Sequence, residues 1–308
     1  MTEQASIPDF VVSLAVSATG ARPRFSICTL VTRPTEYAEM IDSFVSHGFT
    51  PADCEYLCLD NSESNRFDAF CGYNLFLSEA RGDFIILCHQ DILLVDDGRA
   101  ELEQRLDELT AHDPKWGLCG NAGGVSFNRL AVRISDRFGV NQSIGSFPAA
   151  VTALDENFIL VRREANLAMS HDLSGFHFYG ADLCIIADFL GRSAWVIDFH
   201  LRHKGVGTTG ASFYRYRKDV ARKYRKAFRC RFVVTTVTHF FLSGSPILNR
   251  ILTSRVISIR KYSIDLAISF YGILTDDLRY PIDMVVRWYR RRERARALAG
   301  PKNMKSIR

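Results

Sequence analysis

A histidine and an aspartate stand two positions apart where a run of apolar residues ends. The run is Phe84–Cys88, and His89, Gln90 and Asp91 follow it directly. Five such residues in succession are typical of a short strand buried on both faces of a mostly parallel sheet. In open α/β sheets the ligand crevice lies outside the carboxyl ends of the strands. An imidazole and a carboxylate at that edge can hold a divalent metal ion against a phosphate, although a capping aspartate and a surface histidine are the alternative.

The elements around this stretch alternate between strand and helix patterns, which is typical of a doubly wound α/β sheet. Pro34 fits the first turn of the first helix, and Gly48 ends that helix. The stretch 125–150 mixes strand-like and Gly/Ser-rich pieces, and we expect it to carry a mobile loop over the site. Strands are expected at 25–31, 56–59, 84–88, 116–119, 158–161 and 194–197, and helices at 35–47, 66–80, 99–112 and 181–190.

Other polar residues lie at the ends of these elements and are further candidates for a site. Asp182 falls in the first turn of a predicted helix, where a carboxylate that only stabilises the helix dipole contributes about 0.3–1 kcal/mol. A lone histidine after a strand, such as His203, is more often structural than a ligand. The candidates at element ends are Asp60, Asn61, Asp155, Glu156, Asp182 and His203.

Composition predicts a folded chain without a disulfide framework. The 308 residues are 47% hydrophobic, and several of the eight cysteines lie inside strand-like runs, which suits a reducing compartment. Cys54 and Cys58 have no second Cys/His pair at zinc spacing, so we reject a zinc site there. Residues 1–10 hold two acidic residues and no apolar core, and no apolar run reaches the roughly 18 residues of a membrane span. We therefore expect no signal peptide, no membrane span and a cytoplasmic location.

Positive charge gathers towards the C-terminus. The chain has 39 Lys+Arg against 34 Asp+Glu, a net charge of +5, and basic residues crowd the stretches 214–231 and 287–296. Basic and aromatic residues together can lie on an anionic membrane surface, where each charge contributes on the order of 1 kcal/mol; a solvated helical face is the alternative. No recognised module for nucleic acid accompanies the charge, so no nucleic-acid partner is expected. The predicted division is an N-terminal segment 1–23, an α/β domain 24–212 and a basic, mostly helical region 213–308, which is a candidate for peripheral contact with the inner face of a membrane.

Short motifs follow one another in a fixed order over residues 24–210. They are Ser26-Ile-Cys-Thr29, Leu59-Asp60-Asn61-Ser62, Tyr73-Asn74, Ala80-Arg-Gly82-Asp83, His89-Gln90-Asp91, Leu154-Asp155, Gly175-Phe-His177-Phe-Tyr179-Gly-Ala-Asp182-Leu, and Ile197-Asp198 with His203. Each is weak alone, but the set resembles family 2-type glycosyltransferases of the GT-A fold, most of all the StrF-like branch. The resemblance implies a Rossmann-like mixed, mostly parallel sheet flanked by helices, with the basic C-terminal extension outside it.

The resemblance also implies which residues bind the donor. In this family a DXD-type motif holds a divalent metal ion that bridges the diphosphate of a nucleotide sugar. Here the motif reads His-Gln-Asp, so its first carboxylate is missing. Asp91 is then the expected ligand of Mn²⁺ or Mg²⁺, with His89 and His203 as further ligands. The residues implied to contact the nucleotide sugar are Thr29, Asp60, Asn61 and Asp155.

For the acceptor, the resemblance implies that Asp182 is the catalytic base. The pKa of a hydroxyl lies far above neutrality, so a carboxylate must take its proton as attack proceeds. Glu156, His177 and Tyr179 are implied to line the acceptor pocket, although packing inside the fold is the alternative role for Tyr179. The expected function is a metal-dependent, inverting glycosyltransferase that moves a sugar from a nucleotide sugar to a hydroxyl of a glycan or glycoconjugate.

Two other functions stay open. The missing carboxylate of the His-Gln-Asp motif keeps open a non-catalytic protein of the same fold that binds sugar nucleotides or acts as a scaffold. A nucleotidyltransferase would share the sheet and the metal. It would normally need a glycine-rich loop with Lys or Arg after the first strand, and residues 29–35 supply none.

Overall fold

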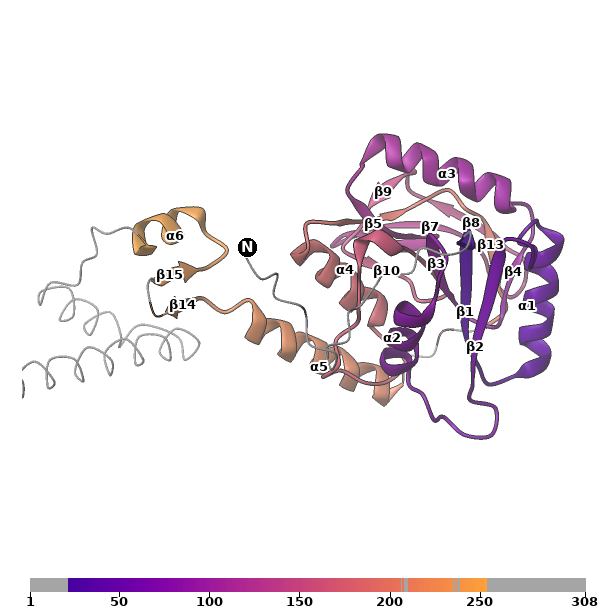
Figure 1. The fold of residues 1–308 in the computed structure, drawn as a ribbon, viewed down its shortest axis with the longest axis horizontal. Helices are drawn as coiled ribbons and strands as arrows, with labels where there is room; N and C mark the ends of the chain where they lie inside the picture. The colour runs from indigo at the N-terminus through magenta and orange to yellow at the C-terminus, as the bar shows by residue number, and fades with distance from the viewer. Residues whose placement is uncertain (1–21, 206, 208–209, 235, 237–238, 254–308) are drawn as a thin grey trace, which may run out of the picture. The chain divides into compact units, whose positions relative to one another are not determined.

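A computed structural model describes residues 22–205, 207, 210–234, 236 and 239–253 (Figure 1). The chain divides into two compact units, Met1–Arg217 and Lys218–Arg308. The predictions for most of the N-terminal segment and for the basic stretch 287–296 lie outside the described residues. The predicted domain boundary at residue 212 stays a prediction.

A seven-stranded sheet forms the centre of the first unit. Its order is β2 (Cys54–Asp60), β1 (Phe25–Val31), β3 (Phe84–Cys88), β11 (Phe158–Arg162), β5 (Trp116–Gly120), β12 (Ser193–Val196) and β9 (Ala149–Ala150). The pairs β1–β2, β1–β3 and β5–β12 are parallel, whereas β11 is antiparallel to both of its neighbours and β9 is antiparallel to β12. Thus β2, β1, β3, β5 and β12 run in one direction, which confirms the predicted mixed, mostly parallel sheet.

Helices cover both faces of this sheet, so β3 is buried on both sides as its apolar run predicts. Ile85 and Leu87 pack in the core cluster that includes α2 (Ala69–Glu79) and α4 (Tyr179–Phe189). Ile86 and Cys88 point the other way, into the cluster of α1 (Pro34–Ser46) and α3 (Arg99–His112). Each fully buried large apolar side chain contributes about 1.5–3 kcal/mol, so these two clusters hold the strand end in place.

A second sheet stands beside the first and supplies part of the site. Its order is β10 (Ala153–Leu154), β6 (Ala122–Ser126), β7 (Arg129–Ser135), β13 (Leu201–His203) and β4 (Ile92–Leu94), and β8 (Asn141–Ile144) pairs with β7. Much of the stretch 125–150, which we expected to carry a mobile loop, is therefore strand. The reason is that β7 is paired on both edges, with β8 antiparallel on one side and β6 then β13 on the other.

The second unit is described over fewer residues. It contains the later part of α5 (Ala211–Ala227), the antiparallel hairpin of β14 (Arg231–Val234) and β15 (His239–Leu242), and α6 (Pro246–Thr253). The rings of Phe232 and Phe241 pack across the hairpin with centroids 4.8 Å apart. Among the helices of the described residues, none has the length and apolar character that a membrane crossing requires.

Candidate metal and donor site

His89, Asp91 and His203 meet just beyond the carboxyl end of β3. One ligand atom from each residue lies within 4.8 Å of the other two. Oδ1 of Asp91 is 3.4 Å from Nε2 of His203 and 4.0 Å from Nδ1 of His89. The antiparallel pairing of β4 with β13 places His203 opposite Ile92, and the Lys204 N–H donates to the Asp91 carbonyl at 2.9 Å. Strand pairing thus brings the three predicted metal ligands together.

Tyr179 sets the orientation and tautomer of His89. Its hydroxyl donates to the Glu156 carbonyl oxygen at 2.9 Å and lies 3.0 Å from Nε2 of His89. Because that carbonyl can only accept, the hydroxyl oxygen is left to accept the Nε2–H of the imidazole. The unprotonated Nδ1 then faces Asp91, which is the arrangement that a metal-binding histidine needs. Tyr179 is 2% exposed, and its predicted place in an acceptor pocket stays a prediction.

Asp91 governs the charge state of the cluster. Burial lowers the pKa of His203, but the hydrogen bond and charge of Asp91 outweigh burial, so this pKa is raised above its ordinary value. Burial raises the pKa of Asp91, but the hydrogen bond and charge of His203 and the charge of His89 hold it below its ordinary value. The pKa of His89 is lowered by burial and then by His203. At neutral pH the cluster therefore holds an ionised carboxylate and a neutral His89.

These residues fit a divalent metal ion. One carboxylate oxygen and two imidazole nitrogens of this spacing can share one coordination sphere, with open positions for further oxygen ligands. Gly205 completes the fit, because a Cβ atom at this position would collide with the Asp91 carboxylate. The cluster therefore needs a glycine two residues after His203.

Gln90 and Arg33 belong to this site and were not among the predicted site residues. The side-chain oxygen of Gln90 accepts from the backbone N–H of Thr32 at 2.8 Å and of Arg33 at 2.9 Å. Its amide nitrogen donates to the Thr32 hydroxyl at 2.7 Å. The Arg33 guanidinium lies 3.8 Å from Oδ2 of Asp91, and its side chain is 59% exposed. Gln90, the middle residue of the His-Gln-Asp motif, thus ties the loop after β1 to the cluster of His89, Asp91 and His203 (the metal cluster). In the sequence, the one signal for this role of Gln90 is its position between two predicted ligands.

Of the residues predicted to bind the donor, Asp60 lies at an accessible strand end. It ends β2 directly beside Val31 of β1, is exposed, and accepts from the Ser62 N–H at 2.8 Å; the bonds from Ser62 hold its pKa below the ordinary value. Thr29 is fully buried, with its hydroxyl 3.4 Å from the Cys88 sulfur. The amide of Asn61 is bonded on both sides to the Phe67 backbone. Thr29 and Asn61 thus face internal partners.

Asp155 and Glu156 lie close to the metal cluster. The exposed Asp155 accepts from the Asn157 N–H at 3.0 Å. Its charge adds to the rise in the pKa of His203 and opposes the burial that lowers the pKa of His89. The Glu156 side chain is 19% exposed, and its Oε2 lies 3.9 Å from Nδ1 of His177. Burial, and then the charge of Asp155, raises the pKa of Glu156 to about 8. Burial lowers the pKa of His177.

Asp182 occupies the first turn of α4, as predicted, but its carboxylate faces the protein interior. The residue has no exposed surface. Ser170 donates to both of its oxygens, from the backbone N–H at 2.8 Å and from the hydroxyl at 2.7 Å. This geometry does not support the predicted role of Asp182 as catalytic base, which stays a prediction.

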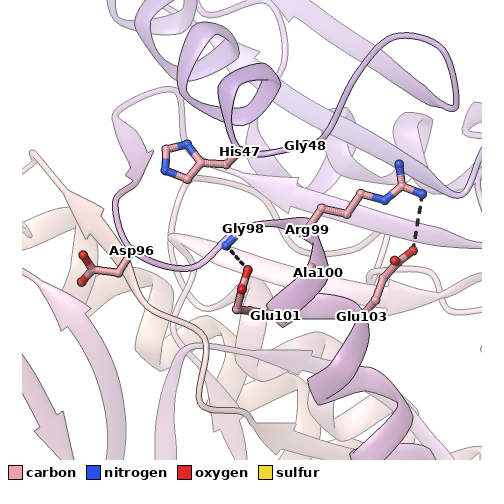
Figure 2. A pocket seen from close by; sticks show the side chains of 8 residues that line it. All are labelled: His47, Gly48, Asp96, Gly98, Arg99, Ala100, Glu101 and Glu103. Atoms are coloured by element: carbon pink, nitrogen blue, oxygen red, sulfur yellow. Dashed lines mark hydrogen bonds and ion pairs between the residues drawn. The ribbon is translucent and has the colours of Figure 1, made fainter.

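The first unit has two cavities whose lining residues do not include His89, Asp91 or His203. One, of about 410 Å³, lies at the start of α3 (Figure 2). There the Gly98 N–H donates to Glu101 at 2.8 Å, and Arg99 pairs with Glu103 at 3.4 Å, so the lining groups serve the helix end. The other, of about 810 Å³, lies between α2 and residues 166–174 and includes Ser170, the partner of Asp182.

One relative shows the family of this chain. The ATP synthase subunits region ORF 6 protein of Fuscovulum blasticum is 40% identical over 226 residues, which are 71% of this chain and 91% of that protein. The chain belongs to the ORF 6 family. The name of this relative describes a gene region and no activity. No family model matches the chain.

Solved structures show a weak likeness to the ORF 6 family chain. A197 from STIV has a TM-score of 0.37 and 13% identity, over 60% of this chain and 86% of that one. The mannosyltransferase PcManGT from Pyrobaculum calidifontis, in complex with GDP-Man and Mn²⁺, has a TM-score of 0.45 and 14% identity, over 82% and 75%. S. aureus TarS 1–349 has a TM-score of 0.44 and 11% identity, over 81% and 79%. All three TM-scores lie below 0.5, so we base no conclusion about function on them.

Proposed function

We propose that this chain is a GT-A-type glycosyltransferase that uses a divalent metal ion and inverts the anomeric centre of the sugar it transfers. The donor is a nucleotide sugar, and the acceptor is a hydroxyl of a glycan or glycoconjugate. The observation that carries the proposal is the cluster of His89, Asp91 and His203 at the carboxyl edge of a mostly parallel sheet, where such sheets bind ligands. The ordered motifs over residues 24–210, with their resemblance to the StrF-like branch, support the same function.

In this proposal Asp91, His89 and His203 hold the metal ion. When bound, the ion neutralises the negative charge that develops on the leaving nucleoside diphosphate. Two imidazoles beside one carboxylate favour Mn²⁺ over Mg²⁺, because Mg²⁺ prefers oxygen ligands. In the same proposal the exposed guanidinium of Arg33, 3.8 Å from Asp91, binds a phosphate oxygen, and Asp60 accepts hydrogen bonds from the ribose or the base.

The test is the thermal stability of the full chain with UDP-, GDP- and dTDP-sugars, each with Mn²⁺, with Mg²⁺ or with EDTA. A ligand present at 100 times its Kd stabilises the folded state by about 2.7 kcal/mol. We expect stabilisation by one nucleotide class, only with metal, and more with Mn²⁺ than with Mg²⁺. Asp91→Asn should remove the response, whereas the exposed, remote Glu79→Gln should keep it. Lack of any metal-dependent response to all donors would contradict the proposal.

The reaction products distinguish this function from two alternatives, a non-catalytic sugar-nucleotide-binding protein and a nucleotidyltransferase. A binding protein would show the thermal response but release no nucleoside diphosphate. A nucleotidyltransferase would release pyrophosphate from a nucleoside triphosphate and a sugar phosphate. Release of nucleoside diphosphate from a nucleotide sugar supports the glycosyltransferase alone.

A second candidate arises from the donor set itself. Two histidines and one carboxylate also hold Fe(II) in non-haem oxygenases, and His89, Asp91 and His203 match that set. The α/β sheet does not choose between these chemistries, because a fold does not imply a function. Anaerobic binding of Fe²⁺, together with no response to any nucleotide sugar, would favour an oxygenase.

We also propose that the chain works on the cytoplasmic side, at the inner face of a membrane. The supporting observation is the exposed basic surface of α5. Anionic lipid attracts such a surface by about 1 kcal/mol for each charge. Its exposed basic residues are Arg215, Arg217, Lys218, Arg222, Arg225 and Lys226.

A further inference from the structure

The carboxylate that would serve as a catalytic base must reach the substrate. Asp182 is fully buried and accepts two hydrogen bonds from Ser170. These bonds attach the segment around Ser170 to α4. Glu156 has a partly exposed side chain, 19% accessible, on the chain segment that leads into β11. Of these two carboxylates, only the Glu156 side chain has surface that a substrate can reach.

Glu156 is also tied to the metal cluster through one shared side chain. The Tyr179 hydroxyl bonds the Glu156 carbonyl at 2.9 Å and lies 3.0 Å from His89 Nε2. The next residue along, Asn157, accepts from the His89 N–H through its backbone carbonyl at 3.0 Å. The segment that carries Glu156 is thus bonded directly to the residue that follows β3.

We propose that Glu156 is the catalytic base that takes the proton of the acceptor hydroxyl. This inference rests on the glycosyltransferase function proposed above. In the step, the acceptor oxygen forms a bond to C1 of the donor sugar as its proton moves to a Glu156 carboxylate oxygen. The bond between C1 and the diphosphate oxygen breaks, and its electron pair leaves with the nucleoside diphosphate.

The surroundings of Glu156 suit this step. Burial and the charge of Asp155 raise its pKa to about 8, which makes its carboxylate a stronger proton acceptor than an ordinary glutamate. His177, 3.9 Å away, faces the Phe213 ring edge-on at a centroid distance of 5.3 Å, and the Tyr216 ring lies 6.1 Å from it. These aromatic rings at the start of α5 offer a wall on which an acceptor sugar ring can stack beside the carboxylate.

A structural role for Glu156 is the alternative that the test must separate. Its Oε1 lies 3.4 Å from the Gly180 N–H in the first turn of α4. The N-cap residue of this helix, Phe178, has a left-handed φ of 68° and no side chain that can cap. The Glu156 side chain can therefore cap the start of α4, where the backbone N–H groups of Gly180, Tyr179 and Phe178 act to lower its pKa against burial. Glutamine keeps an oxygen that accepts the same bond but cannot take up a proton at neutral pH, so Glu156→Gln distinguishes the two roles.

The experiment measures release of nucleoside diphosphate by the full chain with Mn²⁺ at pH 8, with UDP-glucose, UDP-N-acetylglucosamine, GDP-mannose and dTDP-rhamnose as separate donors and water as acceptor. We expect Glu156→Gln to lower the rate about 10²–10⁴-fold. Its Mn²⁺ affinity and its UDP or GDP affinity should stay at parental values, which also shows that the variant is folded. Glu79→Gln, an exposed glutamate of α2, is the matched control, and Asp182→Asn tests the rival base.

Each outcome separates this inference from the proposed function. Turnover by Glu156→Gln at the parental rate would overturn the assignment and leave the glycosyltransferase intact. So would a loss of turnover confined to Asp182→Asn, with folding unchanged, because the base would then be Asp182. A parental protein that binds Mn²⁺ but releases no diphosphate from any of the donors would overturn the proposed function and this step with it.

Discussion

At the scale of single residues, side chains that are not ligands hold the metal cluster and its neighbouring loop in place by hydrogen bonds. His89 is oriented by Tyr179, and the loop that carries Arg33 is held by Gln90. Neither partner is a candidate ligand itself. Their effect is to fix the direction of a nitrogen lone pair and of a guanidinium before any substrate arrives, which is what a site of precise geometry requires.

Replacement of Tyr179 by phenylalanine should therefore weaken metal binding. The hydroxyl that accepts the His89 Nε2–H is lost, so the imidazole loses its preferred tautomer and orientation. We expect the Mn²⁺ affinity, measured by calorimetry, to fall about 10–100-fold. Tyr56→Phe is the matched control, because the Tyr56 hydroxyl bonds the Phe49 carbonyl, away from the cluster. Equal Mn²⁺ affinity in the Tyr179 variant and the parent would contradict the role of Tyr179.

The raised pKa of Glu156 predicts how stability depends on pH. In the unfolded chain this carboxyl loses its proton near the ordinary pKa of about 4.5, whereas in the folded chain it does so near about 8. Between these values unfolding releases a proton, so a rise in pH lowers the free energy of unfolding. Glu156→Gln lacks this contribution.

Urea unfolding at pH 5, 6, 7 and 8, in EDTA, would measure the effect. We expect the stability of Glu156→Gln relative to the parent to increase steadily across this range. A stability difference that does not change with pH would show that the Glu156 carboxyl titrates at an ordinary pKa.

At the scale of elements, the decisive feature is the antiparallel pairing of β4 with β13. It joins the segment after Asp91 to the segment that contains His203. The chain that continues from β13 then passes so close to Asp91 that residue 205 has room only for hydrogen. The geometry of the metal cluster thus depends on the pairing of these two short strands as well as on its three side chains.

Gly205→Ala should disable the metal site without unfolding the sheet. Its Cβ would meet the Asp91 carboxylate, so either this carboxylate or the chain after β13 must shift. We expect calorimetry to show Mn²⁺ affinity reduced by at least about tenfold, the order of effect seen when the support of a metal ligand is lost. Gly207→Ala is the matched control, because nothing lies within 4 Å of a Cβ there. Similar Mn²⁺ affinity in both variants would show that the contact is not limiting.

At the scale of the whole molecule, the chain combines an α/β unit with a strongly basic helix, α5. Only one acidic residue, Asp219, lies within α5, and it pairs with Arg222 at 2.7 Å. Charge of one sign on an exposed helix gives long-range attraction to an anionic surface, and salt weakens that attraction. Such attraction would hold the protein at the membrane surface proposed above.

Binding to lipid vesicles should depend on this charge. We expect the full chain to co-sediment with phosphatidylserine vesicles, less at high salt and little with phosphatidylcholine alone. Lys218→Glu with Arg225→Glu should lower the affinity by at least about tenfold, since each charge contributes about 1 kcal/mol. The control pair Arg129→Glu with Arg137→Glu makes the same charge change on exposed residues outside α5. Equal losses in the two pairs would indicate a general charge effect and no role for α5.

Much of the architecture could be read from local patterns. The apolar run Phe84–Cys88 predicted a strand buried on both faces, and the structure confirms it. Helices and strands of the first unit follow their predicted order, because apolar spacing, Pro34 and Gly48 act within a few residues of the chain. The same local signals placed Asp60 and Asp91 at strand ends.

The sequence by itself determined the main strands and helices of the first unit and the polar residues at their ends, and its resemblance to a known family named the three candidate metal ligands. Only the tertiary structure decided where those side chains point. His203 reaches Asp91 through pairing of β4 with β13, and Asp182 turns towards Ser170 while Glu156 keeps exposed surface. The physical reason is that the direction of a side chain depends on contacts between segments far apart in the chain, and these leave no periodic signal along it.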